Sequence, residues 1–182
     1  MKQHPLEAVA NSLGLLTEWI GKTLAWLSIT MMLAMTAVVV LRYGLNIGSV
    51  FLQESVMYMH AALFLLACGY TLKHDGHVRV DIFYRNFSAK KKALVNLLGT
   101  LTLLMPVMLF IAWSSWGYVE KSWAIKEISS EPGGIPAVYL LKSLIPAMVV
   151  VMLLQALAEL INNSLILLGL KLVDEQNEEP VA

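Results

Sequence analysis

Long apolar stretches dominate the chain, and four of them are long enough to cross a membrane. A transmembrane α-helix needs about 20 consecutive, mostly apolar residues to cross about 30 Å of hydrocarbon. The stretches that meet this requirement cover residues 23–41, 50–70, 94–119 and 135–158. Because backbone groups without hydrogen-bond partners are costly in lipid, each stretch is expected to be helical. The pattern predicts an all-α integral membrane protein with four transmembrane helices.

Two further apolar segments border these spans. Residues 5–20 begin with a proline, which is favoured at a helix start, and set apolar residues at helical spacing against polar ones, as in an interfacial amphipathic helix. At the other end, residues 135–172 as one helix would measure about 55 Å, nearly twice a bilayer core. A glutamate and two asparagines at 159–163 mark where this helix should leave the hydrocarbon. We therefore expect 159–172 to form a second interfacial arm.

These segments make up a single domain. We expect residues 1–172 to form one four-helix membrane domain with an interfacial arm near each end. The remaining residues, 173–182, are acidic and polar and are expected to be disordered.

The distribution of basic residues predicts the orientation, because Lys and Arg near span ends stay in the cytoplasm. Four spans put both termini on the same side as the connector between the second and third spans. Nine basic residues lie on that side and four on the other. The nine are Lys2, Lys22, Lys73, Arg79, Arg85, Lys90, Lys91, Lys92 and Lys171. The sequence thus predicts cytoplasmic termini and an outward-facing loop at 120–134.

Composition narrows the function classes. Hydrophobic residues make up 58% of the chain and charged residues 14%, far from the balance of a soluble domain. The 13 basic residues cancel the 13 acidic ones, and no basic groove with interleaved aromatics occurs, so we expect no nucleic-acid partner. A single cysteine, Cys68, cannot build a disulfide framework. No nucleophile with a nearby base and no phosphate-cradling glycine loop is present, so we expect no enzymatic activity and no cofactor.

Polar residues inside spans are the first functional candidates, because each is costly in lipid without a partner. Glu54 enters the second span from its outer end, and Arg42 and Lys142 lie at a similar depth. We therefore expect an ion pair between Glu54 and a basic partner, with a proton-carrying or substrate-binding role as the alternative. His60 suggests a redox anchor, but a membrane haem usually needs two axial histidines and no second one lies in a span. A helix-contact role is the favoured interpretation of His60.

The connector between the second and third spans is the dense polar block KHDGHVRVD at 73–81. His74, Asp75, His77 and Asp81 could be drawn as a metal cluster, but their spacing matches no tight metal motif, and we expect no metal. Asp75 and Gly76 predict a turn, after which apolar residues lie against the membrane surface.

Several of these residues occur in the order found in a known family. An Arg-Tyr pair ends the first span, an acidic residue lies early in the second, a GH-x-x-VD block follows it, and a Lys-x-x-x-Pro pattern opens the fourth. Over about residues 26–155 the sequence resembles the DctQ-type small membrane subunit of tripartite ATP-independent periplasmic (TRAP) transporters. The residues that carry the resemblance are Arg42, Tyr43, Glu54, His77, Asp81, Lys142 and Pro146.

The resemblance implies a non-catalytic scaffold subunit in the bacterial inner membrane. Such a subunit packs against a large permease subunit and the surrounding membrane lipid, and helps to dock a periplasmic solute-binding protein. The large subunit then imports an organic acid or similar solute, coupled to a sodium gradient. The resemblance makes Glu127 and Glu131 of the outer loop docking candidates and gives the motif residues structural or assembly roles. The alternative function is a small proton-coupled exporter that dimerises and uses Glu54.

Overall fold

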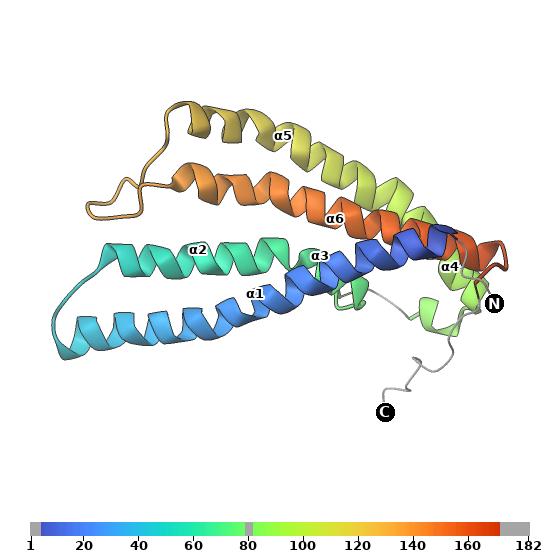
Figure 1. The fold of residues 1–182 in the computed structure, drawn as a ribbon, viewed down its shortest axis with the longest axis horizontal. Helices are drawn as coiled ribbons and strands as arrows, with labels where there is room; N and C mark the ends of the chain where they lie inside the picture. The colour runs from blue at the N-terminus through green and yellow to red at the C-terminus, as the bar shows by residue number, and fades with distance from the viewer. Residues whose placement is uncertain (1–4, 79–81, 172–182) are drawn as a thin grey trace.

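The computed structural model describes residues 5–78 and 82–171, and every regular element in these ranges is helical. Four helical runs are long and apolar enough to span a membrane: Pro5–Gly44, Val50–Lys73, Ala89–Ala124 and Val138–Leu167. The predicted four-span, all-α architecture is confirmed. The runs form one elongated bundle (Figure 1). We call the end with the connections 45–49 and 125–137 the loop end, and the opposite end, where the first helix begins, the terminal end.

Helix α1 (Pro5–Gly44) is continuous over about 60 Å, at a rise of 1.5 Å per residue. It joins the predicted interfacial segment 5–20 to the first span and crosses α3 and α6 near the terminal end (Figure 1). Its buried residues in this part are small and recur every three or four positions: Ala10, Gly14, Thr17 and Gly21. One face of segment 5–20 is therefore packed against other helices, because small side chains let helix backbones approach closely. Its position relative to a membrane surface stays a prediction.

Two glycines show how close these helices approach. A Cβ atom added at Gly21 of α1 would lie 2.4 Å from the Tyr70 ring, and one added at Gly69 would lie 2.6 Å from Val151 on α6. Only a residue without a side chain fits either contact. The crossing of α1, α3 and α6 is therefore specified by glycine.

The second run consists of α2 (Val50–Leu66) and α3 (Cys68–Lys73), with a turn at Ala67 between them. The Ser49 side chain caps α2 by accepting a hydrogen bond from the Leu52 N–H at 3.3 Å. After α3 the chain reverses at Asp75, whose φ is +52°, and the Gly76 N–H bonds the Thr71 carbonyl at 2.9 Å. This is the C-terminal cap typical of a helix that ends in a left-handed residue, and it confirms the predicted turn.

The third run has three parts. It begins with α4 (Ala89–Gly99), passes through one π-helical turn, η2 (Thr100–Leu104), and ends with α5 (Met105–Ala124). A short 3₁₀ turn, η1 (Tyr84–Asn86), precedes it. Pro106 explains the π turn, because a proline inside a helix has no N–H to donate and crowds the carbonyl four residues earlier. The wider turn allows the helix to continue through that position.

Helix α6 (Val138–Leu167) packs against α1, α2, α3, α4 and α5 and is the centre of the bundle. Val149 and Met152 of α6 form the core with Met108 of α5. The helix does not stop at the polar residues 159–163 but continues to Leu167. Within this stretch the Asn163 side chain donates to the Glu159 carbonyl at 2.8 Å. The predicted arm 159–172 is thus a helical extension of the span as far as Leu167. The predicted disordered tail, 173–182, lies outside the described residues.

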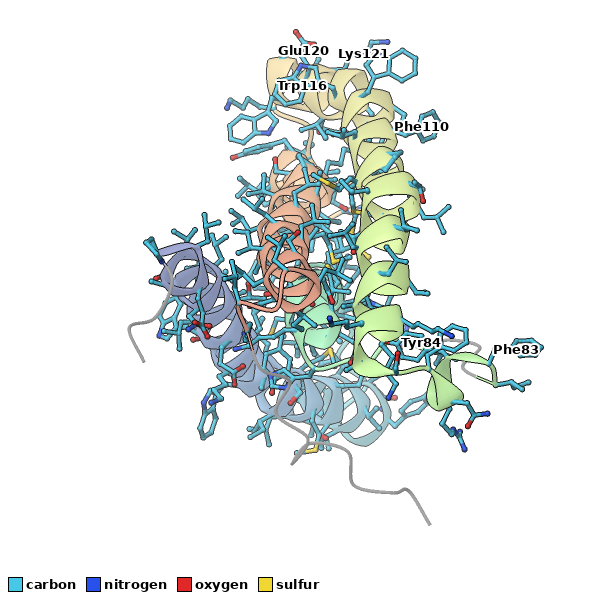
Figure 2. All side chains as sticks on the ribbon, turned by 90° about the vertical axis from the view of Figure 1, so that its right-hand side faces the viewer. Phe83, Tyr84, Phe110, Trp116, Glu120 and Lys121 are labelled. Carbon is cyan, nitrogen blue, oxygen red and sulfur yellow. The ribbon has the colours of Figure 1, made fainter. Side chains whose placement is uncertain are left out.

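The bundle surface is strongly apolar. Phe110 and Trp116 project away from α5 (Figure 2), and both side chains are well exposed, at 61% and 65%. Exposure of such a surface to water would cost free energy, whereas its exposure to lipid tails does not. Phe83, in the connector before α4, also points away from the bundle (Figure 2).

Candidate functional site

Glu54 ties α2 to the loop that joins α5 and α6. Its Oε1 accepts a hydrogen bond from the Ser129 hydroxyl, and its Oε2 accepts one from the Ile135 backbone N–H at 2.5 Å. The Ser129 hydroxyl in turn accepts a bond from the Glu131 N–H at 3.2 Å. Both carboxylate oxygens are engaged, which favours a structural role for Glu54 over the proton-carrying alternative. We call Glu54, Ser129, Gly134 and Ile135 the Glu54 anchor.

Gly134 makes this anchor possible. A Cβ atom at this position would lie 2.4 Å from Ser129 Oγ and 2.7 Å from Glu54 Oε1, so a larger residue would push the loop off the carboxylate. The preceding Gly133 has a φ of +78°, a left-handed conformation that glycine adopts without strain. In the EPGG sequence, Gly133 therefore allows the turn of the loop, and Gly134 allows its close approach to α2.

A second contact holds the start of the same loop. Glu127 forms an ion pair with Lys142 of α6 at 2.5 Å, and the Lys142 ammonium lies 3.9 Å from the centre of the Tyr118 ring. The hydrogen bond from the Lys142 ammonium lowers the pKa of the Glu127 carboxyl below its ordinary value. The Glu127 backbone adds two bonds: its N–H donates to the Ser122 carbonyl, and its carbonyl accepts from the Val138 N–H, both at 3.0 Å.

Aromatic residues surround the beginning of the loop. Trp123 donates its indole N–H to the Ser143 hydroxyl at 2.7 Å and packs edge-on against Tyr139. Lys126, which has a φ of +49°, places its ammonium 4.2 Å from the Trp123 ring centre and 4.9 Å from that of Tyr139. Cation–π contacts of this kind offset the strain of a left-handed lysine.

Within the described residues, Glu54 has other partners than the expected basic side chains. Among the described residues, neither Arg42 nor Lys142 forms an ion pair with it. The physical reason is that the 125–137 loop folds over the end of α2 and offers its own donors to the carboxylate. Lys142 pairs with Glu127 instead, and Arg42, in the last turn of α1, is exposed.

The remaining predicted residues are dispersed. Tyr43 is 77% exposed at the loop end, and His77 is exposed in the connector after α3. Pro146 lies inside α6 and lines a groove with Trp116 and Trp123. Glu131 is exposed near the tip of the loop. Asp81 lies outside the described residues.

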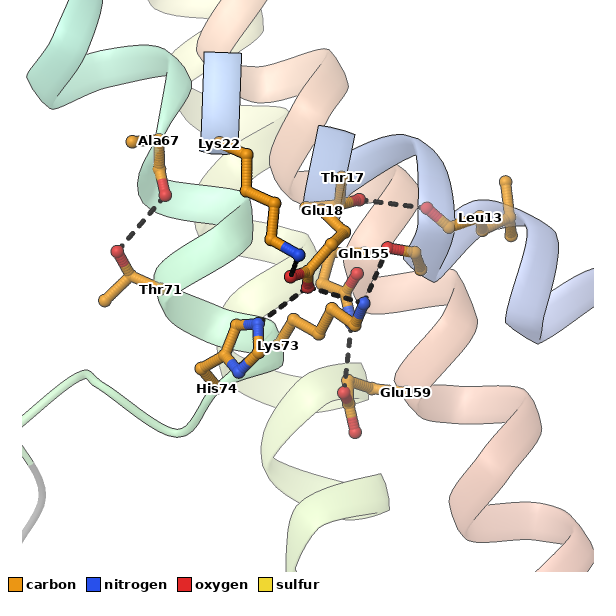
Figure 3. A network of polar contacts seen from close by, with 11 residues as sticks. Leu13, Thr17, Glu18, Lys22, Ala67, Thr71, Lys73, His74, Gln155 and Glu159 are labelled. Carbon is orange, nitrogen blue, oxygen red and sulfur yellow. Dashed lines mark hydrogen bonds and ion pairs between the residues drawn. The ribbon is translucent and has the colours of Figure 1, made fainter. Parts of the chain in front are cut away.

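A polar cluster at the terminal end went unnoticed in the sequence. The Glu18 carboxylate of α1 lies 2.8 Å from the Lys73 ammonium, 2.7 Å from the His74 Nε2 and 3.0 Å from the Lys22 ammonium (Figure 3). Lys73 also donates to the Gly14 carbonyl at 2.9 Å. This Glu18 cluster joins α1 to the end of α3, next to the glycine-dependent crossing. The spacing of Glu18 and Lys22, one helical turn apart, was the one signal available.

Three carboxylates among the described residues connect separate elements. No group of three or more His, Cys, Asp or Glu side chains in these ranges is placed to hold a metal ion. The Glu18 and Glu54 carboxylates bind groups that are distant in sequence. The Glu127 carboxylate binds Lys142, which follows on the helix after the loop. The polar contacts of the site therefore hold a loop in a fixed position on a bundle of membrane-spanning helices.

The fold and these contacts define a multi-pass helical membrane protein whose polar groups hold helices and one loop in place. Residues 31–165 match the family described as tripartite ATP-independent periplasmic transporters, DctQ component. This match covers more than half of the 182 residues, so the chain belongs to the DctQ family of TRAP transporter components. Comparison with the curated proteins and with the solved structures finds no match.

Proposed function

We propose that this chain is the scaffold subunit of a TRAP-type secondary transporter that imports an organic acid or a related solute. It packs against the large permease subunit in the bacterial inner membrane and carries no catalytic site of its own. Membership of the DctQ family supports the assignment to such a complex. The fixed outer loop supports the further role, which is to help dock the periplasmic solute-binding protein.

The observation that carries this role is the Glu54 anchor. A loop of 13 residues, 125–137, would ordinarily be mobile, and a partner that bound it would have to order it first. Here the Ser129 and Ile135 bonds to Glu54, together with the Glu127 to Lys142 ion pair, hold it against two helices. The exposed tip, with Glu131, is thus presented in one conformation, which lowers the entropic cost of docking.

In the proposed orientation the loop end faces the periplasm and the terminal end faces the cytoplasm. The excess of Lys and Arg on the terminal side supports this orientation. It also brings the tip of the loop to the side on which a periplasmic binding protein is found. The Glu18 cluster and the connector with His77 then lie at the cytoplasmic surface.

A binding measurement tests the docking role. The complex of this chain with its large subunit is captured on a surface, and the affinity of the binding protein is measured by surface plasmon resonance. We expect Glu131→Lys to weaken docking severalfold, chiefly through the association rate, because an exposed interfacial charge steers encounter. The matched control is Lys90→Glu, a charge reversal at the terminal end, which should leave docking unchanged. Equal docking by all three proteins would refute the role of the loop.

A further inference from the structure

An open groove runs between α1 and α2 on one face of the bundle. Its volume is about 930 Å³. Four methionines supply much of its apolar lining: Met31, Met32 and Met35 from α1 and Met57 from α2. Methionine side chains are flexible and polarisable, and they recur on surfaces that adapt to a partner. The groove is therefore suited to receive another apolar element.

Three polar side chains in the groove have no partner in the described part of the chain. Arg42 of α1 and Gln53 and His60 of α2 all line it. None of the three has a hydrogen bond or ion pair with any residue in the described ranges, although His60 stacks on the Phe64 ring. His60 lies well inside the second run, where lipid tails cannot supply hydrogen bonds, and Gln53 lies near the loop end of the same run.

Other polar side chains on the same helices are satisfied internally. The hydroxyls of Thr30, Thr36 and Ser55 each donate to the carbonyl four residues earlier, at 3.2, 2.9 and 2.7 Å. Such residues tolerate lipid. An unbonded histidine well inside a span does not, since a polar group in hydrocarbon costs free energy unless a neighbour pairs with it. In having polar side chains without partners among the described residues, the groove differs from the surface of α5 that carries the exposed side chains of Phe110 and Trp116.

We propose that this groove is the docking surface for a transmembrane helix of the large permease subunit. The proposal rests on the proposed function, which supplies the partner, and adds which face meets it. Gln53 and His60 are seven residues apart, so they lie two helical turns, about 10 Å, from each other on one face of α2. The partner helix presents two hydrogen-bonding side chains at the same separation, with small or apolar residues against the methionines. It presents a carboxylate or carbonyl opposite the Arg42 guanidinium.

A pair of substitutions on α1 tests the surface. Met35 and Leu33 are both exposed, at 51% and 61%, but they lie two residues apart and so face opposite sides of the helix. Only Met35 lines the groove. Each is replaced by tryptophan, and the variants are co-expressed with a tagged large subunit from the same transport system. We expect Met35→Trp to lower the recovered complex at least about tenfold, equivalent to about 1.4 kcal/mol, while Leu33→Trp copurifies like the unmodified chain.

A second variant distinguishes a partner helix from lipid. If the groove faces lipid, Gln53→Leu with His60→Leu removes two unfavourable polar groups, so the variant assembles fully with the large subunit. If a partner helix pairs with them, the same variant accumulates normally in the membrane but loses the complex. Full assembly of both Met35→Trp and the double variant would overturn the proposal and leave the scaffold function standing. Failure of the unmodified chain to copurify at all would overturn the scaffold function and the docking surface together.

Discussion

The Glu54 carboxylate on α2 accepts a hydrogen bond from the backbone N–H of Ile135, 81 positions later in the chain, at 2.5 Å. This bond and the one from Ser129 connect a transmembrane helix to the loop that joins α5 and α6. A charged acceptor in a half-buried site makes stronger hydrogen bonds than a neutral one. The conformation of the loop therefore depends on a residue that belongs to a different helix hairpin.

Removal of the anchor carboxylate should release the loop. We expect Glu54→Ala to lower the free energy of unfolding in detergent by about 1–3 kcal/mol, since the Ser129 hydroxyl and the Ile135 N–H lose a charged acceptor. Glu54→Gln keeps one acceptor oxygen and should lose less. Thermal unfolding gives the stability, and the rate of proteolysis after Lys126 reports on the loop. The control is Glu131→Ala, which removes an exposed carboxylate from the same loop; an equal effect of both alanine variants would contradict the anchor.

Gly134→Ala should loosen the loop without touching any charge. The added methyl group would meet the Ser129 hydroxyl and a Glu54 oxygen at less than 3 Å, so the loop must shift away. We expect faster proteolysis of 125–137, similar to that of Glu54→Ala. At Gly117 of α5 an added Cβ meets nothing within 4 Å, so Gly117→Ala is the matched control and should leave the loop protected. Protection of the loop in Gly134→Ala would show that the close approach is not required.

The start of the loop should respond to acid through Glu127. The folded-state pKa of this carboxyl is lowered by Lys142 from its ordinary value of 4.5, so the ion pair stabilises the loop fully above about pH 4.5. This contribution is lost as the pH falls through the lower, folded-state pKa. A spin label at Ser130→Cys, in a Cys68→Ala background, should become more mobile in that acid range.

The control for this acid response is Lys142→Gln. Without the ammonium, Glu127 loses its ion-pair partner and the main cause of its lowered pKa, so the label should be mobile at higher pH than in the unmodified chain. An identical acid transition with and without Lys142 would assign the response to another group.

The helix crossing near the terminal end should depend on Gly21. A Cβ atom there would lie 2.4 Å from atoms at the base of the Tyr70 ring, which cannot swing aside. We expect Gly21→Ala to cost about 1–3 kcal/mol of stability, as overpacking usually does. Gly99→Ala, in a helical position with open space, should be neutral or stabilising by at most about 1 kcal/mol. Thermal unfolding of the two variants in the same detergent gives the comparison, and equal stability would refute close packing at Gly21.

The spans were predictable from the sequence, and the partners of the polar residues were not. Hydropathy depends only on which residues are apolar, so the four runs followed directly, and so did the turn at Asp75 and Gly76. Glu54 stands out in the sequence as a polar residue inside an apolar span. Its partner could not be found, because the donor at Ile135 is a backbone N–H, which every residue except proline carries.

Segment 5–20 illustrates a second limit. Its large apolar residues predict an amphipathic helix, whereas the positions that the bundle buries are Ala10, Gly14 and Thr17, whose side chains are small. Packing of this kind depends on how closely two helices approach. The spacing of large apolar residues along the sequence does not predict that distance. The Glu18 cluster was missed for the same reason, since Lys73 and His74 meet Glu18 only once α1 crosses α3.

Transport by the reconstituted complex tests the central claim most directly. The large subunit and the solute-binding protein of the same system are reconstituted in proteoliposomes with and without this chain, and solute uptake is followed under an inward sodium gradient. The scaffold role predicts uptake with the chain present, and little or no uptake, with reduced recovery of the large subunit, when it is omitted. Full uptake by the large subunit and binding protein alone would contradict the account.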